Sequence, residues 1–526
     1  MAGLATGGQT KHWQPAAAGS GPAGPGPAGT PPTGGGAHAR HPAHDTRPAH
    51  DTRPGRAPGR LAALRTTPGR LRTAIAVIVL VACGLGVLTA LVFGSVNAGL
   101  TSIGGTDAPL VEESTGLYFS VNDMDAQVAN VLLAGHSTDP ALAADRSQDL
   151  SIYAADRQRA EQDLQQVTAT SAGNPAAQHA VGTILGALSQ YEALAADAIL
   201  TNQNGNDPPG RPSAATLGYY QQATDLMQNA VLPAAGSLTS ANANSLDSSY
   251  SQDHSAAQNG RLFIVLLGVV LIALLVAAQV FLAIRYRRMI NLGLVAATLL
   301  AIVFTVAGAA QLGAQASQLR VAKVDAFDSI LALSQARAVS YDANANESRY
   351  LVDPGRAAAY QNDFLTQSRQ LADVGNVGIF QYDAALASDI DAYRSDNADV
   401  RFNGYLGTEF RNITFPGERA AAVKALLAYQ VYERDDRHLR ALAKANLDEA
   451  IAYDVGTSPG QSDWAFNNWD TALTSVIAIN QDAFNTAIHD GHSDGSGWNG
   501  PIPAIAVVAI AVIALAGTRR RLAEYR

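Results

Sequence analysis

The sequence predicts an all-α membrane protein with four transmembrane helices and two extracytoplasmic antiparallel helical bundles. Hydrophobic residues make up 47% of the 526-residue chain, but only 6% of its residues are aromatic. Most of this apolar content is alanine and leucine, which favour helices over strands. Four apolar runs approach or exceed the roughly 20 helical residues that cross a bilayer core about 30 Å thick. Between these runs, apolar residues recur every three or four positions, which indicates amphipathic helices.

Residues 1–72 are rich in Gly, Pro, Ala and His, a composition that cannot bury enough apolar surface to offset chain entropy. We interpret them as a disordered cytosolic tail. The apolar run at 73–93 is predicted to be the first transmembrane helix. It is longer than the apolar stretch of about 7–15 residues in a secretory signal peptide, so we expect an uncleaved anchor.

Residues 94–261 are predicted to form the first extracytoplasmic bundle. We expect Gly104-Gly105 and Pro109 to interrupt the continuation of the first membrane helix. Asp139-Pro140 is predicted to open the second helix of this bundle, because aspartate is a good N-cap and proline a good first helical residue. Further breaks are expected at 173–175 and 202–212. Four helices separated by such loops favour an antiparallel bundle.

Two apolar runs, at 262–284 and 290–312, are predicted to be the second and third transmembrane helices, joined by a turn at 285–289. Arginines near the ends of membrane helices favour the cytosolic side, so this turn is predicted to be cytosolic. Its arginines, together with those of the C-terminal tail, are the predicted cytosolic contacts with lipid phosphate or a protein partner: Arg285, Arg287, Arg288, Arg519, Arg520 and Arg521.

Residues 313–500 are predicted to form the second extracytoplasmic bundle. No proline occurs between Met289 and Asp353, so the third membrane helix is predicted to continue outward as one rod of roughly 60 residues, or about 90 Å. Asp353-Pro354 is expected to cap and open the next helix. Further helices are expected at 416–453 and 462–489, followed by a linker at 490–500. A fourth transmembrane helix at 501–517, with Trp498 at its outer edge, and a cytosolic tail at 518–526 complete the prediction.

The two predicted extracytoplasmic segments are acidic: residues 94–260 hold 4 basic and 17 acidic side chains, and residues 313–500 hold 15 and 25. The single cysteine, Cys83, excludes an intrachain disulfide framework. No phosphate-binding loop, zinc-binding helix or nucleophile elbow is present, so we expect neither an enzyme nor a cofactor. Asp435, Asp436 and Arg440 are interpreted as part of a solvated charged face on a long helix. The apolar runs lack ionisable residues, which argues against a transporter.

The architecture resembles a known class of receptors. Paired membrane helices with an exported bundle resemble the sensor modules of chemoreceptors and membrane histidine kinases, and residues 344–351 resemble the junction between the first two helices of those modules. Two such units with four spans and no output domain resemble the GlnX-type membrane proteins of actinobacteria. That resemblance implies a role between an exported amino-acid-binding lipoprotein and a cytosolic serine/threonine kinase.

We therefore expect a non-enzymatic sensory transducer in the plasma membrane, with multiple spans and both termini in the cytosol. The expected partners are membrane lipids, a solute-binding lipoprotein outside and a Ser/Thr kinase inside; a homodimer is left open, and no nucleic acid is expected. Two alternatives also stay open. The protein could be a structural envelope scaffold, or it could sense a small molecule directly through Arg349. The competing interpretation of Arg349 is an interhelix salt bridge.

Overall fold

A computed structural model describes residues 67–286 and 291–523 of the chain. Every regular element within those residues is a helix, and the one β-bridge among them, between Asp373 and Asn403, is isolated. The all-α prediction is therefore confirmed. All of these residues belong to one compact unit.

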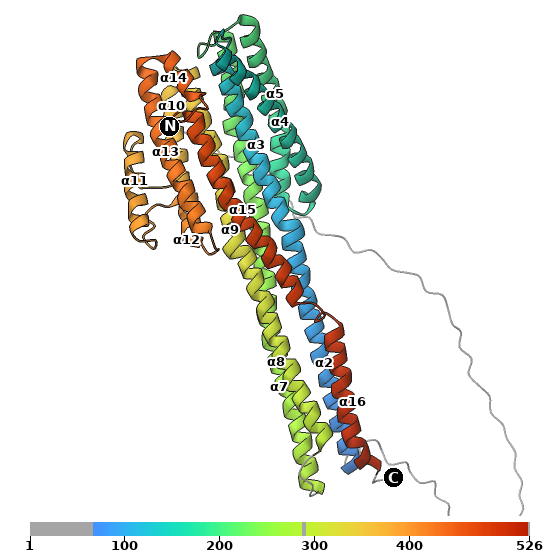
Figure 1. Cartoon of the computed structure of the whole chain (residues 1–526). Helices are drawn as coiled ribbons and strands as arrows, with labels where there is room; N and C mark the ends of the chain where they lie inside the picture. The colour runs from blue at the N-terminus through green and yellow to red at the C-terminus, as the bar shows by residue number, and fades with distance from the viewer. Residues whose placement is uncertain (1–66, 287–290, 524–526) are drawn as a thin grey trace, which may run out of the picture. The chain divides into compact units, whose positions relative to one another are not determined.

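Three long rods dominate this unit (Figure 1), and each is two α-helices joined by a π-helical turn. The wider π turn inserts one extra residue into the helix without ending it. The rods are α2 (Thr67–Ser102), η1 (Ile103–Asp107) and α3 (Ala108–Ala134); α6 (Ala214–Leu226), η3 (Met227–Val231) and α7 (Leu232–Tyr286); and α8 (Leu292–Arg320), η4 (Val321–Phe327) and α9 (Asp328–Val352).

Four helices among the described residues are long and apolar enough to cross a membrane: the three rods and α16 (Pro501–Ala523). In α2, Leu80 and Leu91 point outward and are 72% and 67% exposed, while Ile78 and Leu85 are buried against the neighbouring helices. Soluble proteins rarely expose such contiguous apolar surface, whereas lipid covers it without cost. The chain is therefore a multi-pass membrane protein. Residues 94–261 and 313–500, which connect the predicted spans, are called here the first and second extramembrane segments.

The predicted break after the first span is wrong. Gly104 and Gly105 lie in η1, and the helix runs on without a loop from α2 into α3. A π turn can accommodate Pro109, which has no N–H to donate and would crowd a regular α-helical turn. A Cβ on Gly104 would lie 2.9 Å from Ile488 Cγ2, so this glycine permits a close approach of α15 (Ser462–Asp494) rather than ending the helix.

The membrane-proximal helices pack closely around small residues. A Cβ on Gly293 of α8 would lie 2.7 Å from Gly517 Cα of α16, so both glycines are needed for this crossing. Asn291 caps α8, and its Nδ2 donates to the Gly517 carbonyl at 2.9 Å. Trp498, predicted to lie at the outer edge of the fourth span, stacks against Phe93 of α2 and Phe304 of α8.

In the first extramembrane segment, α4 (Pro140–Thr170) packs against α3, and α5 (Pro175–Gly205) packs against α6 and α7. The predicted helix start at Asp139-Pro140 is confirmed, because the Asp139 carboxylate accepts from the Ala141 N–H at 2.8 Å. Asn174 caps α5 in the same way after the short 3-10 helix η2 (Ser171–Gly173). A cap satisfies backbone N–H groups that have no partner within the helix.

The second extramembrane segment differs from prediction at three helix ends. Asp353 follows α9 and does not open the next helix, which starts four residues later, at Ala357. The helix expected at 416–453 is divided at Asn446, which caps a separate short helix. The helix expected to end at 489 continues to Asp494. The helices of this segment after α9 are α10 (Ala357–Leu371), α11 (Ile379–Ser395), α12 (Gly404–Asn412), α13 (Glu418–Ala445), α14 (Leu447–Asp454) and α15.

The two extramembrane segments pack against each other along α3 and α9. Most of α3 is buried, since α4 and α7 cover it from its own segment and α9 from the other. The apolar core of the first segment also takes in Leu351, Leu439 and Ile451 from the second. A second core lies wholly within the second segment, around Trp469. This shared boundary between two bundles positions the features described next.

Candidate functional site: a pocket and a buried charge network

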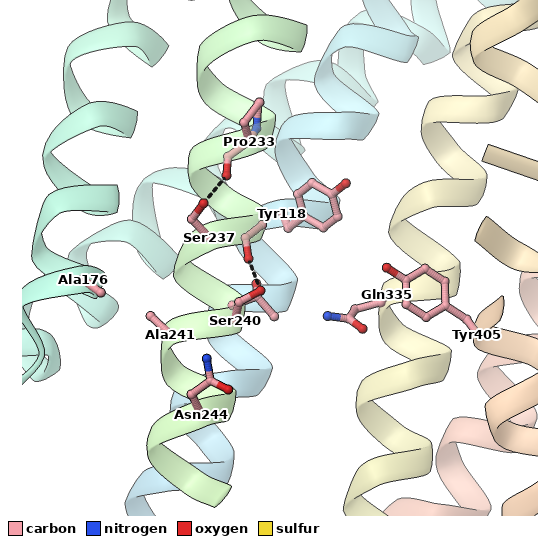
Figure 2. Close-up of a pocket in the computed structure, with 11 residues that line it drawn as sticks. Tyr118, Ala176, Pro233, Ser237, Ser240, Ala241, Asn244, Gln335 and Tyr405 are labelled. Atoms are coloured by element: carbon pink, nitrogen blue, oxygen red, sulfur yellow. Dashed lines mark hydrogen bonds between the residues drawn. The ribbon is translucent and has the colours of Figure 1, made fainter. Parts of the chain in front are cut away.

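A pocket of about 500 Å³ lies where the two extramembrane segments meet. Figure 2 shows α7 as one wall, Gln335 of α9 and Tyr405 of α12 facing it, and Tyr118 of α3 between them. Pockets of this size are typical of small-molecule sites. The lining residues are Tyr118, Ala176, Pro233, Gly236, Ser237, Thr239, Ser240, Ala241, Asn244, Gln335 and Tyr405.

The α7 wall presents Ser237, Ser240 and Asn244 at spacings of three and four residues, which places them on one face of the helix. The Ser237 hydroxyl donates to the Pro233 carbonyl at 2.7 Å, and the Ser240 hydroxyl donates to the Gly236 carbonyl at 2.8 Å. Each hydroxyl oxygen therefore keeps lone pairs that can accept a further hydrogen bond. A Cβ on Gly236 would meet no atom within 4 Å, so the missing side chain leaves open space in this wall.

The opposite wall is also polar but uncharged. Burial raises the pKa of Tyr405, and burial together with the Asp342 carboxylate raises the pKa of Tyr118. Both hydroxyls therefore stay protonated at neutral pH and can donate. No residue of the pocket lining carries a charge. The pocket is thus rich in hydrogen-bonding groups and electrically neutral.

Further along α9, fourteen residues and about 21 Å past Gln335 of the pocket, Arg349 is buried and held by two aspartates. Its guanidinium donates to Asp125 of α3 at 2.6 Å and to Asp342 of α9 at 2.8 Å, and also to Asn346 at 2.8 Å. Burial alone would lower the pKa of Arg349, but the two carboxylates raise it above its usual range. Conversely, burial raises the pKa of Asp125, which Arg349 offsets in part. The ion pair joins α3 of the first segment to α9 of the second.

Further hydrogen bonds extend this connection. Asp342 accepts from Gln228 Nε2 at 2.8 Å, and Gln228 belongs to the π turn η3 of the first segment. Asp342 also accepts from Gln367 of α10. Asp353 accepts from Gln221 of α6 at 2.8 Å. The boundary between the segments is therefore held by directional polar bonds as well as apolar contacts, which specify one alignment of the helices.

A second buried cluster surrounds Ser348, the residue before Arg349. Ser348 Oγ lies 2.9 Å from Asp454 Oδ2 and 2.6 Å from Asn130 Oδ1 of α3. Burial raises the pKa of Asp454 to about 7. Burial and the neighbouring carboxylates Asp436 and Asp454 raise the pKa of Glu347 well above its usual range. Arg440 is the arginine that acts on the three buried carboxyls Glu347, Asp436 and Asp454. One positive charge cannot balance three negative ones, so at neutral pH the cluster retains a proton.

The interpretation of Asp435, Asp436 and Arg440 as part of a solvated charged face is wrong, although Arg434, Arg437 and His438 of the same stretch are exposed. Asp436 and Arg440 are each 1% exposed and form a buried bidentate pair at 2.6 and 2.9 Å. The Arg440 guanidinium also lies over the rings of Tyr350 and Phe364. The expected i, i+4 pairing is present, but the face is covered by α9 and α10 because Arg440 can be neutralised locally.

Of the site residues predicted from sequence, Arg349 lies at the centre of the segment boundary. Both terminal nitrogens of its guanidinium are paired with protein carboxylates. This arrangement matches the interhelix salt bridge, which was the competing interpretation to contact with a ligand. Arg519 is exposed at the end of α16, and Arg520 and Arg521 continue that helix. Arg285 lies in the last turn of α7. Arg287 and Arg288 fall outside the described residues. The role of these arginines stays a prediction.

Sequence reasoning missed the pocket residues and the partners of Arg349. Tyr118, Gln335 and Tyr405 are far apart in the chain and match no motif. The signal available for Asp125 was weak, because its helix also carries Glu112, Glu113 and several uncharged polar side chains, so the sequence does not mark this carboxylate as buried. In the described part of the chain no cluster of His, Cys, Asp and Glu is arranged to hold a metal ion.

The fold and site together describe a helical, multi-pass membrane protein whose extramembrane helices meet at a pocket. Residues 99–251 match the family model of the actinobacterial sensor domain. This match covers less than a third of the chain, and it supports an actinobacterial sensor protein. It includes the α3 and α7 walls of the pocket and Asp125, but not Arg349, Gln335 or Tyr405. No curated protein and no solved structure matches the chain.

Proposed function

We propose that the protein is a non-enzymatic transmembrane sensory transducer, in which a signal at the boundary between the extramembrane segments moves helices in the membrane. One observation supports this most strongly. The pocket lies between α7 and α9, and both helices continue without a loop into predicted spans. The match to a sensor domain suggests the sensory role. A ligand can shift such an equilibrium only if it binds two helix arrangements differently.

The spans that meet the pocket are themselves in contact. Gln279 Nε2 of α7 donates to Thr298 Oγ1 of α8 at 2.8 Å, within the predicted second and third membrane helices. Because α8 continues through η4 into α9, a displacement of α7 against α9 at the pocket should change this contact. Each of the three rods also contains a π turn, a feature that is frequent at functional sites in helices.

A wedge experiment tests this coupling without knowledge of the ligand. Gly236→Trp places a large side chain into the open space of the α7 wall, and Gly182→Trp places the same side chain on the exposed face of α5. In a Cys83→Ala background, the rate of disulfide formation between Gln279→Cys and Thr298→Cys is measured in membranes. We expect Gly236→Trp to change the rate severalfold and Gly182→Trp to leave it unchanged. Equal rates in both would contradict transduction.

The proposed partners follow from the architecture and its resemblance to GlnX-type proteins. We propose that an exported solute-binding lipoprotein, carrying an amino acid, docks on the extramembrane helices and that a cytosolic Ser/Thr kinase contacts the arginine turn in the plasma membrane. The uncharged pocket gives no partner for the carboxylate and ammonium groups of a free amino acid, which favours delivery by a binding protein. Co-purification of each partner with the full chain tests this assignment. For the kinase, replacing Arg285 and Arg519 should abolish the co-purification.

A further inference from the structure

The geometry points to a neutral, hydroxyl-rich ligand, such as a short saccharide, in the pocket between α7, α9 and α12. This inference rests on the proposed function, because it names the ligand class of the same pocket. It adds a direct binding activity alongside any docked protein. Charge, hydrogen bonding, aromatic surface and space each support it.

The absence of charge in the lining selects against ionic ligands. A phosphate or carboxylate would find no lysine or arginine in the lining to pair with, and an ammonium group no aspartate or glutamate. The side chains of Ser237, Ser240 and Asn244 are exposed, so the pocket is open to water on the α7 side. Asp342, the carboxylate that raises the pKa of Tyr118, is already paired with Arg349. The first extramembrane segment is strongly acidic, which further disfavours anions.

The unpaired polar groups match those of a polyol. Among the described residues, the side-chain amides of Asn244 and Gln335 and the hydroxyl of Tyr405 form no hydrogen bond with the protein. Each amide can both donate and accept, while Ser237 and Ser240 keep acceptor lone pairs towards the pocket. A sugar hydroxyl is likewise both donor and acceptor. A wall of this kind can form hydrogen bonds with several adjacent hydroxyls of one ligand. An apolar ligand would leave these polar groups without partners.

The two tyrosines supply surface for a sugar ring. Tyr118 and Tyr405 are half-buried and come from different segments, one on α3 and one on α12. Aromatic rings bury large areas at little cost in side-chain entropy and pack against the C–H faces of pyranose rings. Figure 2 shows Tyr118 behind the space between Ser237 and Gln335. A ligand seated there would contact both segments at once.

Titration calorimetry on the full chain in lipid nanodiscs tests the ligand class, since sugar-headed detergents would compete. The neutral probes are maltotriose, triacetylchitotriose and myo-inositol; the charged probes are galacturonate, glucosamine and glutamate. We expect at least one neutral probe to bind at least tenfold more tightly than every charged one. Gly236→Trp should abolish this binding. Gln335→Ala should weaken it about three- to tenfold, the effect of one lost hydrogen bond, and Gly182→Trp should leave it unchanged.

The results separate this inference from the proposed function. If no neutral probe binds, if a charged probe binds more tightly, or if binding survives both Gly236→Trp and Gln335→Ala, the ligand class is wrong even where the wedge still alters the Gln279–Thr298 crosslink. If a saccharide binds as expected while the wedge leaves that crosslink unchanged, the ligand class is supported and transduction is wrong. Gln335→Ala, shown to be folded by its elution from a size-exclusion column, still tests the ligand class if Gly236→Trp misfolds.

Discussion

Replacing Arg349 by methionine should expose the cost of the buried charge network. Asp125 is fully buried, and its remaining hydrogen bond is from Thr224 at 3.3 Å, so loss of the guanidinium leaves it without a charge partner. Asp342 keeps Gln228 and Gln367. Removing one partner of a buried pair costs about 3–5 kcal/mol, mainly because a buried charge is left uncompensated. We expect Arg349→Met to lower the apparent free energy of unfolding by about that amount.

The assay is guanidinium unfolding of the purified full chain in detergent. Asp125→Asn in the Arg349→Met background should restore about 1–3 kcal/mol, because it removes the unpaired carboxylate. Arg394→Met is the matched control: its partner Asp391 lies 4.0 Å away and both side chains are more than half exposed, so we expect a loss below about 1 kcal/mol. The reasoning is refuted if Arg349→Met costs no more than Arg394→Met, or if Asp125→Asn worsens it.

Three further predictions concern pH, membrane packing and the lone thiol. Burial raises the pKa of Glu433 from 4.5 to about 8. The stability that Glu433 contributes is therefore present below about pH 4.5 and is lost as the pH rises through about 8. Glu433→Gln should flatten the fall in the free energy of unfolding that is measured between pH 5 and 9. Gly293→Val should weaken the α8–α16 crossing by about 1–3 kcal/mol, whereas Gly94→Val, with open space around it, should change thermal stability little. Cys83 is exposed in the middle of a predicted span, so lipid should keep a water-soluble maleimide from labelling it in membranes, whereas a denaturing detergent should allow labelling.

The membrane helices could be predicted because their signal is local. An apolar run long enough to span a bilayer has few alternatives, and the proline-free stretch from 290 to 352 correctly indicated a single rod. The caps at Asp139 and Asn174 are equally local. Gly104-Gly105 misled the prediction because two glycines and a proline usually mark a loop, whereas contact with Ile488 and a π turn keep this helix intact.

The site could not be predicted because its parts meet only in the folded chain. Asp125 and Arg349 are paired across more than two hundred residues, and nothing near either residue indicates the other. The sequence predicts solvated side chains for Asp436 and Arg440 because charges are seldom buried. That rule fails here because the two partners lie one turn apart on the same helix and neutralise each other. The pocket depends on how α7 lies against α9, which no local pattern encodes.

The most direct test of the central claim is a distance measured at the membrane ends of α7 and α8. Spin labels at Ile284→Cys and Leu292→Cys, both exposed positions, report the separation of these helices in a Cys83→Ala chain reconstituted in lipid. If the pocket governs the membrane helices, Gly236→Trp shifts the distance distribution and Gly182→Trp does not. Identical distributions in the two variants would show that the pocket and the membrane helices are not coupled.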